Sequence, residues 1–232
     1  MPPATAPQEQ NGDVAVVIDR LSKHFGSAPA LQDLSAQISY GRLTGLVGPD
    51  GAGKTTLMRI LTGLLVPNSG HATVAGFDVA DDNDAIHVAT GYMPQRFGLY
   101  EDLSVMENMR LYAQLRGMDA DGHTDLFAQL LDFTRLAPFT GRLAGKLSGG
   151  MKQKLGLACA LMARPAVLLL DEPGVGVDPV SRQDLWRMVQ ALTDEGMAVV
   201  WSTAYLDEAE RCDNVLLLNE GQLAYDGPPG EL

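Results

Sequence analysis

The stretch GPDGAGKTT, residues 48–56, has residue types and spacing that could bind phosphate groups. It lies between the apolar runs LTGLV and LMRILTGLL, which are an expected strand and an expected helix. Glycines let backbone N–H groups turn toward phosphate oxygens at the positive end of the helix dipole. Lys54 would add a charge for the β and γ phosphates, and Thr55 a hydroxyl for Mg²⁺. A glycine-rich turn with a chance Gly-Lys pair is the alternative. The predicted nucleotide-binding residues here are Gly48, Pro49, Asp50, Gly51, Ala52, Gly53, Lys54, Thr55 and Thr56.

Two acids end the next strongly apolar run, AVLLLDEP at residues 166–173. When such a strand shares a sheet with a phosphate-binding loop, the first acid, Asp171, orders Mg²⁺ through its water shell. Glu172 is then placed to polarise an attacking water molecule. An acidic strand end that faces solvent is the alternative, and the phosphate-binding loop earlier in the chain argues against it.

The segment KLSGGMKQK, residues 146–154, predicts another anion-binding helix end. A serine followed by two glycines and a helical pattern is typical of a helix N-terminus, where free N–H groups attract anions. One chain therefore carries two such ends. Which anion the second helix end binds depends on the group that it faces.

A turn after a buried strand lacks a polar side chain where one is expected. WSTAYLDEAE, residues 201–210, ends a strand and enters an acidic helix. In α/β proteins the carboxyl ends of strands carry reactive groups. Ala204 offers only a methyl group at this position.

The elements that must position these residues alternate along the chain, which indicates an α/β fold with a mostly parallel sheet and helices on its faces. Helical periodicity covers about 102–162 and begins with a capping box, Ser104 and Glu107. Strand-like runs lie at 14–19, 34–39, 43–48, 166–171, 197–203, 214–220 and 222–227. Helical patterns lie at 104–117, 123–136 and 181–192.

Composition narrows the class of protein further. The chain has 232 residues, 46% of them hydrophobic, and a net charge of −12, which argues against a general nucleic-acid binder. Two distant cysteines and four isolated histidines favour neither a disulfide framework nor a metal cluster. No apolar run is long enough for a membrane span. Residues 1–13 are proline-rich and are predicted to be a disordered lead-in.

With these motifs at 48–56, 146–154 and 166–173 along the chain, it resembles the ATP-binding subunits of ABC transporters. GPDGAGKTT is similar to Walker A, LSGGMKQK to the signature motif and VLLLDEP to Walker B, and the resemblance extends from Phe25 to Asp213. It implies a P-loop NTPase fold with a mostly parallel core sheet, an antiparallel β subdomain and an α-helical signature subdomain. The ATP-binding domain would cover 14–232, with the helical subdomain at about 96–162.

The resemblance assigns roles to further residues. Phe25 corresponds to the aromatic platform for adenine, although a core phenylalanine is the alternative. Gln95 in GYMPQ corresponds to a glutamine that contacts Mg²⁺ and the attacking water. Residues 148–150 would bind the γ-phosphate held by a second ATP-binding domain, in a head-to-tail dimer. Asp178 falls at the D-loop position across that interface, although the residues before it depart from the commonest pattern. The signature residues are Ser148, Gly149 and Gly150.

In this family the turn at Ala204 usually carries a histidine that contacts the γ-phosphate. Losing one preorganised contact to the transition state costs about 10²–10³ in rate, whereas nucleotide binding depends on many groups. We therefore expect ATP to bind and to be hydrolysed slowly at this chain's own site. A neighbouring side chain or a water that replaces the histidine is the alternative.

The first hypothesis for function is an ATPase that drives a membrane exporter. Its partners would be a transmembrane permease subunit and a second ATP-binding domain, with no nucleic acid, and its place the cytoplasmic face of the cell membrane. YMPQRFGLYEDLSVMENMRLY resembles the ABC-2 exporter branch, and the end at GPPGEL is typical of one half of a tandem subunit. The alternatives are a non-hydrolytic nucleotide-dependent clamp and a soluble ABC ATPase acting on ribosomes or DNA, which the acidic charge disfavours.

Overall fold

The computed structural model describes residues 13–95, 98–118 and 124–232. The predicted disordered lead-in lies outside these residues except for Asp13. The strands are β1 (Val14–Phe25), β2 (Ala28–Ser39), β3 (Leu43–Val47), β4 (Ser69–Val74), β5 (Phe77–Asp78), β6 (Thr90–Met93), β7 (Val167–Leu170), β8 (Ala198–Thr203), β9 (Asn214–Asn219) and β10 (Gln222–Gly227). The helices are α1 (Lys54–Leu61), α2 (Asn83–Ala89), α3 (Val105–Leu115), α4 (Thr124–Phe133), α5 (Gly149–Ala160), α6 (Pro179–Asp194) and α7 (Leu206–Ala209).

The core sheet has the strand order β10-β9-β3-β8-β7-β6. It is mostly parallel, as the sequence predicted. Every neighbouring pair is parallel except β10 with β9. Each residue of β3, β7 and β8 is buried, because helices or the second sheet cover both faces. This burial explains why these strands are continuous apolar runs in the sequence.

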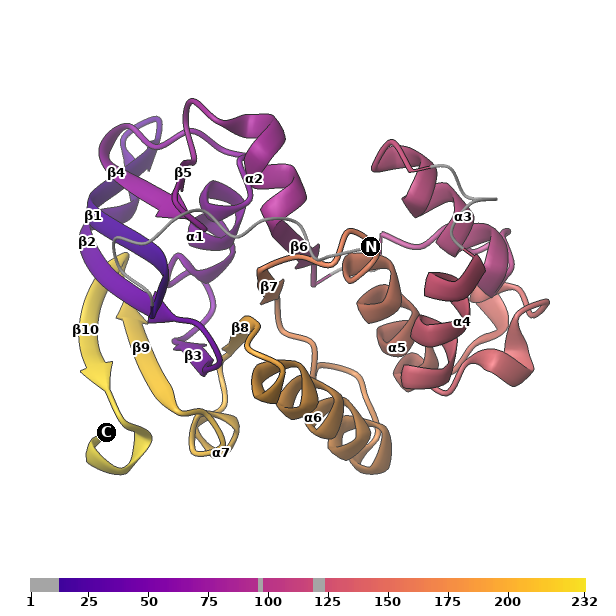
Figure 1. Ribbon diagram of the computed structural model, residues 1–232. Helices are drawn as coiled ribbons and strands as arrows, with labels where there is room; N and C mark the ends of the chain where they lie inside the picture. The colour runs from indigo at the N-terminus through magenta and orange to yellow at the C-terminus, as the bar shows by residue number, and fades with distance from the viewer. Residues whose placement is uncertain (1–12, 96–97, 119–123) are drawn as a thin grey trace.

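The second sheet is antiparallel, with the order β2-β1-β4-β5, and lies beside α1 (Figure 1). Its first hairpin is longer than the sequence indicated, because β1 continues to Phe25 and β2 begins at Ala28. The pairing shifts register near Arg20 and Asp33, both of which have positive φ. Such irregularities interrupt the alternation of apolar and polar residues, so the pattern revealed only parts of each strand. The predicted antiparallel β region is confirmed.

Helices α3, α4 and α5 gather at the opposite end of the molecule from the antiparallel sheet (Figure 1). The predicted capping box is present at α3, where Ser104 Oγ accepts from Glu107 N at 3.2 Å and Ser104 N donates to Glu107 Oε2 at 2.7 Å. Helix α4 ends at Phe133, earlier than the pattern indicated, because Arg135 has φ 58° and turns the chain away. The boundaries of a separate helical subdomain at 96–162 stay a prediction.

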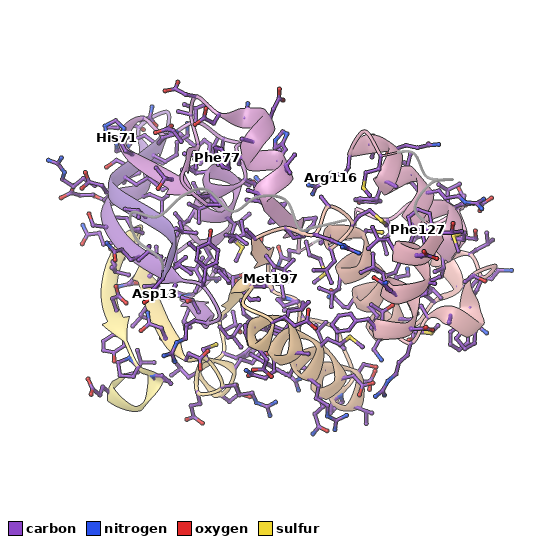
Figure 2. The ribbon with its side chains drawn as sticks, viewed as in Figure 1. Asp13, His71, Phe77, Arg116, Phe127 and Met197 are labelled. Carbon is purple, nitrogen blue, oxygen red and sulfur yellow. The ribbon has the colours of Figure 1, made fainter. Side chains whose placement is uncertain are left out.

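One arginine ties these helices to the core sheet. Arg116 follows the last residue of α3, and its guanidinium donates to the backbone carbonyls of His87 and Thr90, the latter at 3.1 Å (Figure 2). Thr90 begins the edge strand β6. The contact anchors the end of α3 on the sheet edge that leads to Gln95.

Cys159 and Cys212 are both free and buried. Across the residues that the structure describes, we find no helix with the length and apolarity needed to cross a bilayer.

Candidate functional site

The predicted phosphate loop connects β3 to α1. Gly53 precedes the helix with φ 105°, a backbone region that side chains rarely adopt. A Cβ atom on Gly53 would also lie 2.5 Å from the carbonyl oxygen of Ala30 in β2. Only glycine fits this position, so the loop is pressed against the antiparallel sheet. The first turn of α1 then opens toward the cavity with free N–H groups.

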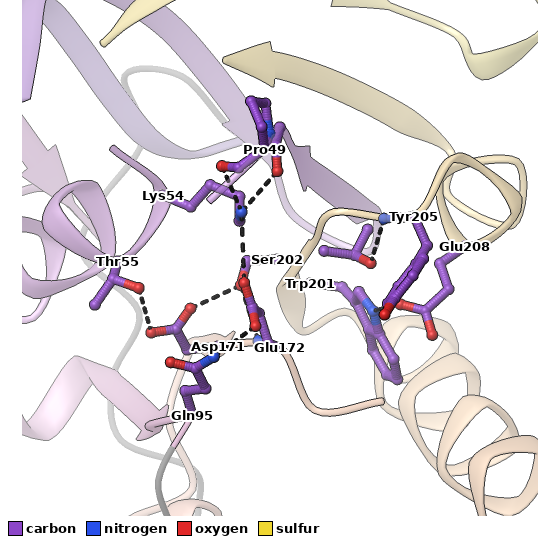
Figure 3. Close-up of polar contacts among 12 residues, drawn as sticks. Pro49, Lys54, Thr55, Gln95, Asp171, Glu172, Trp201, Ser202, Tyr205 and Glu208 are labelled. Atoms are coloured by element: carbon purple, nitrogen blue, oxygen red, sulfur yellow. Dashed lines mark hydrogen bonds and ion pairs between the residues drawn. The ribbon is translucent and has the colours of Figure 1, made fainter. Parts of the chain in front are cut away.

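Lys54 is buried beneath the loop with 4% of its surface exposed. Its Nζ donates to the carbonyls of Gly48 at 2.6 Å and Pro49 at 3.1 Å, and it lies 3.4 Å from Oε1 of Glu172 (Figure 3). These contacts bring together two residues that are 118 positions apart in the chain. The ammonium group is fixed between the loop and the end of β7.

Asp171 receives hydrogen bonds on both carboxylate oxygens. Thr55 Oγ1 donates to Oδ2 at 2.8 Å, and Ser202 Oγ donates to Oδ1 at 2.8 Å. The hydroxyl of Tyr92 also approaches Oδ2, at 3.3 Å, and burial together with the Asp171 charge raises the pKa of Tyr92 to about 12. Asp171 is therefore held rigidly, with Thr55 beside it.

Glu172 follows directly and has an unusual backbone conformation, φ 50°. Its amide donates to Ser202 Oγ at 2.9 Å, and its Oε2 accepts from Gln95 Nε2 at 2.7 Å. Its two carboxylate oxygens thus face Lys54 and Gln95. A positive φ at a non-glycine residue is strained, and the hydrogen bond that the Glu172 amide donates to Ser202 helps to hold it.

A cavity of about 600 Å³ lies in front of these groups. Its wall carries Lys54, Gln95 and Glu172, together with the methyl group of Ala204. The residues that line it are Ala30, Asp50, Gly51, Ala52, Gly53, Lys54, Thr55, Thr56, Gln95, Glu172, Val175, Ala204 and Tyr205. Most of these lining residues were predicted from the sequence, and Ala204 lies among them.

The predicted signature residues and Asp178 form a second group. Ser148 begins α5 and accepts from Met151 N at 3.3 Å, and Asp178 begins α6 and accepts from the amides of residues 180 and 181. Cβ atoms on Gly149 and Gly150 would lie 2.9 Å from Gly176 O and 2.3 Å from Ser181. The start of α5 thus packs directly on the segment that carries Asp178. Among the described residues, Ser148, Gly149, Gly150 and Asp178 are not part of the cavity wall.

The family described as ABC transporter matches residues 31–175, which is more than half of the chain. The chain belongs to the ABC transporter family. The predictions of this family and of a P-loop fold are therefore confirmed, and the motifs described above are those of an ABC ATP-binding domain.

Two curated relatives of this ABC domain are named as ATP-binding proteins. It is 61% identical over 222 residues to the Escherichia coli K12 protein named "Probable multidrug ABC transporter ATP-binding protein YbhF". That match covers 95% of this chain and 38% of YbhF, so the chain spans well under half of that relative. It is also 35% identical over 226 residues to the doxorubicin resistance ATP-binding protein DrrA of Mycobacterium tuberculosis H37Rv, covering 96% of this chain and 68% of DrrA.

Solved structures agree with the fold of the ABC domain. An ATP-binding subunit of an ABC transporter superposes with a TM-score of 0.82 at 29% identity, covering 92% of this chain and 90% of that one. The protein cbiO1 from Clostridium perfringens, part of the complex cbiONQ, gives a TM-score of 0.85 at 25% identity, with 94% and 90% covered.

Phe25 lies at the end of β1 in this ABC domain, with 54% of its surface exposed and Lys23 Nζ 5.7 Å from the ring centre. The alternative of a core phenylalanine is therefore wrong. Phe25 is not on the cavity wall described above, and its contact with adenine stays a prediction.

Two hydroxyl groups of the site, those of Ser202 and Tyr92, were not predicted from the sequence. Both lie on strands that neighbour β7, and both contact Asp171. A signal existed for Ser202, because a serine interrupts the apolar run VVWST two residues before Ala204. For Tyr92 there was none, since β6 itself went unrecognised in the sequence.

Proposed function

We propose that this chain is the ATP-binding and ATP-hydrolysing domain of an ABC-type membrane exporter, with slow hydrolysis at its own site. The observation that carries the proposal is the cavity lined by Lys54, Thr55, Gln95 and Glu172, with the buried Asp171 accepting a hydrogen bond from Thr55. The names of YbhF and DrrA support an export role and drugs as cargo.

The phosphate loop supplies the binding energy in this proposal. Free N–H groups at the start of α1 and the charge of Lys54 would hold the β and γ phosphates. Thr55 and Asp171 offer adjacent oxygen ligands, 2.8 Å apart, which suits Mg²⁺ held by few protein groups and by phosphates. That ion, when bound, would neutralise charge on the phosphate oxygens. Phe25 would stack on adenine.

Glu172 would act on the attacking water. Its carboxylate lies between Lys54 and Gln95, so phosphates that take the place of Glu172 beside Lys54 would leave it bonded to Gln95. Gln95 then orients Glu172 and the water. The hydrogen bond from the Glu172 amide to Ser202 fixes the backbone from which the Glu172 side chain extends.

Ala204 is the reason for the expected slow rate. Its methyl group lies on the cavity wall and offers no hydrogen bond to a phosphate or to water. The neighbouring Tyr205 is more than half exposed, and its amide bonds to Thr203 Oγ1 rather than facing a ligand. This observation also favours the second candidate function, a nucleotide-dependent clamp with negligible hydrolysis.

Partners follow from the second group of residues. Ser148, Gly149, Gly150 and Asp178 lie apart from the cavity wall, which supports their use on a nucleotide held by another ATP-binding domain. That domain would be a second copy or another part of a longer polypeptide. A transmembrane permease subunit at the cytoplasmic face of the membrane would complete the exporter.

Calorimetry and single-turnover kinetics test the proposal. MgATP titrated into the folded chain should release heat at one site, and the absence of heat would refute nucleotide binding. Ala204→His should then raise single-turnover hydrolysis about tenfold or more. Leu206→His, an exposed residue of α7 outside the cavity wall, is the matched control and should leave the rate unchanged. Equal rates for wild type and Ala204→His would contradict the slow site, and MgATP binding without turnover, in the isolated chain and with its permease, would favour the clamp.

A further inference from the structure

A buried carboxylate lies behind the turn that carries Ala204. Glu208, in α7, has 4% of its surface exposed. Its Oε2 accepts from Trp201 Nε1 at 3.0 Å, a bond buried in the core next to the end of β8 (Figure 3). Placing a carboxylate in the interior is costly unless its partners are fixed, so the contacts on its other oxygen are informative.

The second oxygen of Glu208 faces two other parts of the site. Oε1 lies 3.6 Å from Nη1 of Arg182 and, among the described residues, accepts no hydrogen bond. A Cβ atom on Gly174 would lie 2.4 Å from Oε1, so the loop after Glu172 runs directly against the carboxylate. Gly174 is buried and two residues from Glu172.

Arg182 extends the contact to the D-loop position. It lies in the first turn of α6, where its amide donates to the carbonyl of Asp178 at 2.9 Å. One turn further on, Trp186 stacks on Trp201 with ring centres 3.9 Å apart and planes at 19°. The side chain of Glu208 therefore joins the end of β8, the start of α6 and the loop after Glu172.

We infer that Glu208 is a positioning residue that sets the geometry of Glu172, Asp178 and the Ala204 turn relative to one another. The inference rests on the proposed function, since these three segments carry the groups that would act on nucleotide. Glu208 does not line the cavity and touches no reacting atom. Glu208 would act by fixing the three segments. Its Oε1, which accepts no hydrogen bond among the described residues, lies so close to Gly174 that the loop after Glu172 cannot move toward it.

The two tryptophans give a direct readout of this contact. Trp186 and Trp201 are the only tryptophans in the sequence, and both belong to the cluster around Glu208. A change in the loop after Glu172 on nucleotide binding should therefore reach Trp201 through Glu208. Intrinsic fluorescence of the whole chain then reports the coupling without any label.

The test compares Glu208→Gln with wild type and with Glu210→Gln, an exposed residue at the end of the same helix. Glutamine keeps the shape and an acceptor for Trp201 but loses the ion pair with Arg182. We expect the fluorescence change on adding MgATP to fall at least threefold and kcat to fall roughly tenfold, because small displacements of reacting groups are costly. KM for ATP should stay within twofold. Glu210→Gln should keep the wild-type values.

A second variant keeps the test decisive if Glu208→Gln does not fold. Gly174→Ala pushes on the same oxygen from the loop, and the backbone of Gly174 is in a region that alanine adopts. We expect the same loss of kcat and of the fluorescence change, again with KM unchanged. Wild-type kcat and fluorescence in a folded Glu208→Gln or Gly174→Ala variant would overturn the inference. A wild-type chain that neither binds nor hydrolyses ATP would instead refute the proposed function.

Discussion

Replacing Ser202 with alanine tests whether one buried hydroxyl holds both acids of the site in place. Ser202 is fully buried in β8, and its Oγ donates to Asp171 Oδ1 and accepts from the amide of Glu172, at 2.8 and 2.9 Å. Alanine removes one oxygen and both hydrogen bonds, and leaves the backbone of the strand unchanged. The two acids then lose a partner that they share.

The cost in stability follows from what is left unbonded. Asp171 keeps its contacts with Thr55 and Tyr92 on Oδ2, but Oδ1 loses its donor, and the Glu172 amide loses its acceptor. An unsatisfied buried group costs about 1–3 kcal/mol, so the free energy of unfolding should fall by about 2–4 kcal/mol. For a chain of this size we expect Tm to fall by roughly 5–15 °C. Urea unfolding of the nucleotide-free chain measures the loss directly.

The effect on activity has the same origin. Glu172 has a strained backbone, and without the bond to Ser202 its carboxylate is less well fixed beside Gln95. Loss of a group that orients a reacting residue costs about 10–100-fold, and we expect that loss in kcat. The dissociation constant of MgATP should change by less than about threefold, because the phosphate loop carries most of the binding.

A matched control removes a buried hydroxyl elsewhere. Thr134 is fully buried after α4, and its Oγ1 donates at 2.6 Å to the carbonyl of Leu130, which also accepts from the Thr134 amide. Thr134→Val should therefore cost little stability and no activity. If Ser202→Ala shows wild-type kcat, or loses no more stability than Thr134→Val, the role assigned to Ser202 is wrong.

Two further predictions concern packing and thiol chemistry. Gly150→Ala should destabilise the chain by about 1–3 kcal/mol in urea unfolding, because its Cβ would lie 2.3 Å from Ser181 and overpacking outweighs the gain in helix propensity. Gly141→Ala, in open space, should be neutral, and equal effects would refute the clash. Burial raises the pKa of Cys212 to about 12 and that of Cys159 further, so both thiols should react with Ellman's reagent only after unfolding. Their raised pKa values add stability that is complete below the ordinary value of 9.0 and is lost as pH rises above it, and rapid labelling of the native chain at pH 8 would contradict this burial.

Much of the fold was predictable because burial leaves a clear pattern in the sequence. The strands β3, β7 and β8 are buried on both faces and read as continuous apolar runs. The start of helix α3 was predictable from the capping box formed by Ser104 and Glu107. By contrast, β4, β5, α2 and β6 went unrecognised. These elements are short, from two to seven residues, and β4 is only half buried, so local periodicity was too weak to identify them.

The site was predictable where function depends on the backbone and on residue order. Gly53, Lys54 and Thr55 are recognisable because a loop that wraps phosphates needs glycines and a helix start at fixed spacing. Ser202 and Tyr92 were not, since they reach Asp171 from other strands and nothing near them in sequence indicates it. The contacts of Glu208 depend on three separate segments in the same way.

The sequence by itself determined the family, the order of the motifs and the absence of a polar group at Ala204, because these are properties of residue type and spacing. Only the tertiary structure decided which side chains meet. Strands β3, β8 and β7 lie side by side and run parallel. The loop after β3 and the acids after β7 therefore lie at the same edge of the sheet. The hydrogen bond from Thr55 to Asp171 acts over 2.8 Å and joins residues 116 positions apart in the chain. Such contacts depend on the packing of the sheet, which no local pattern specifies.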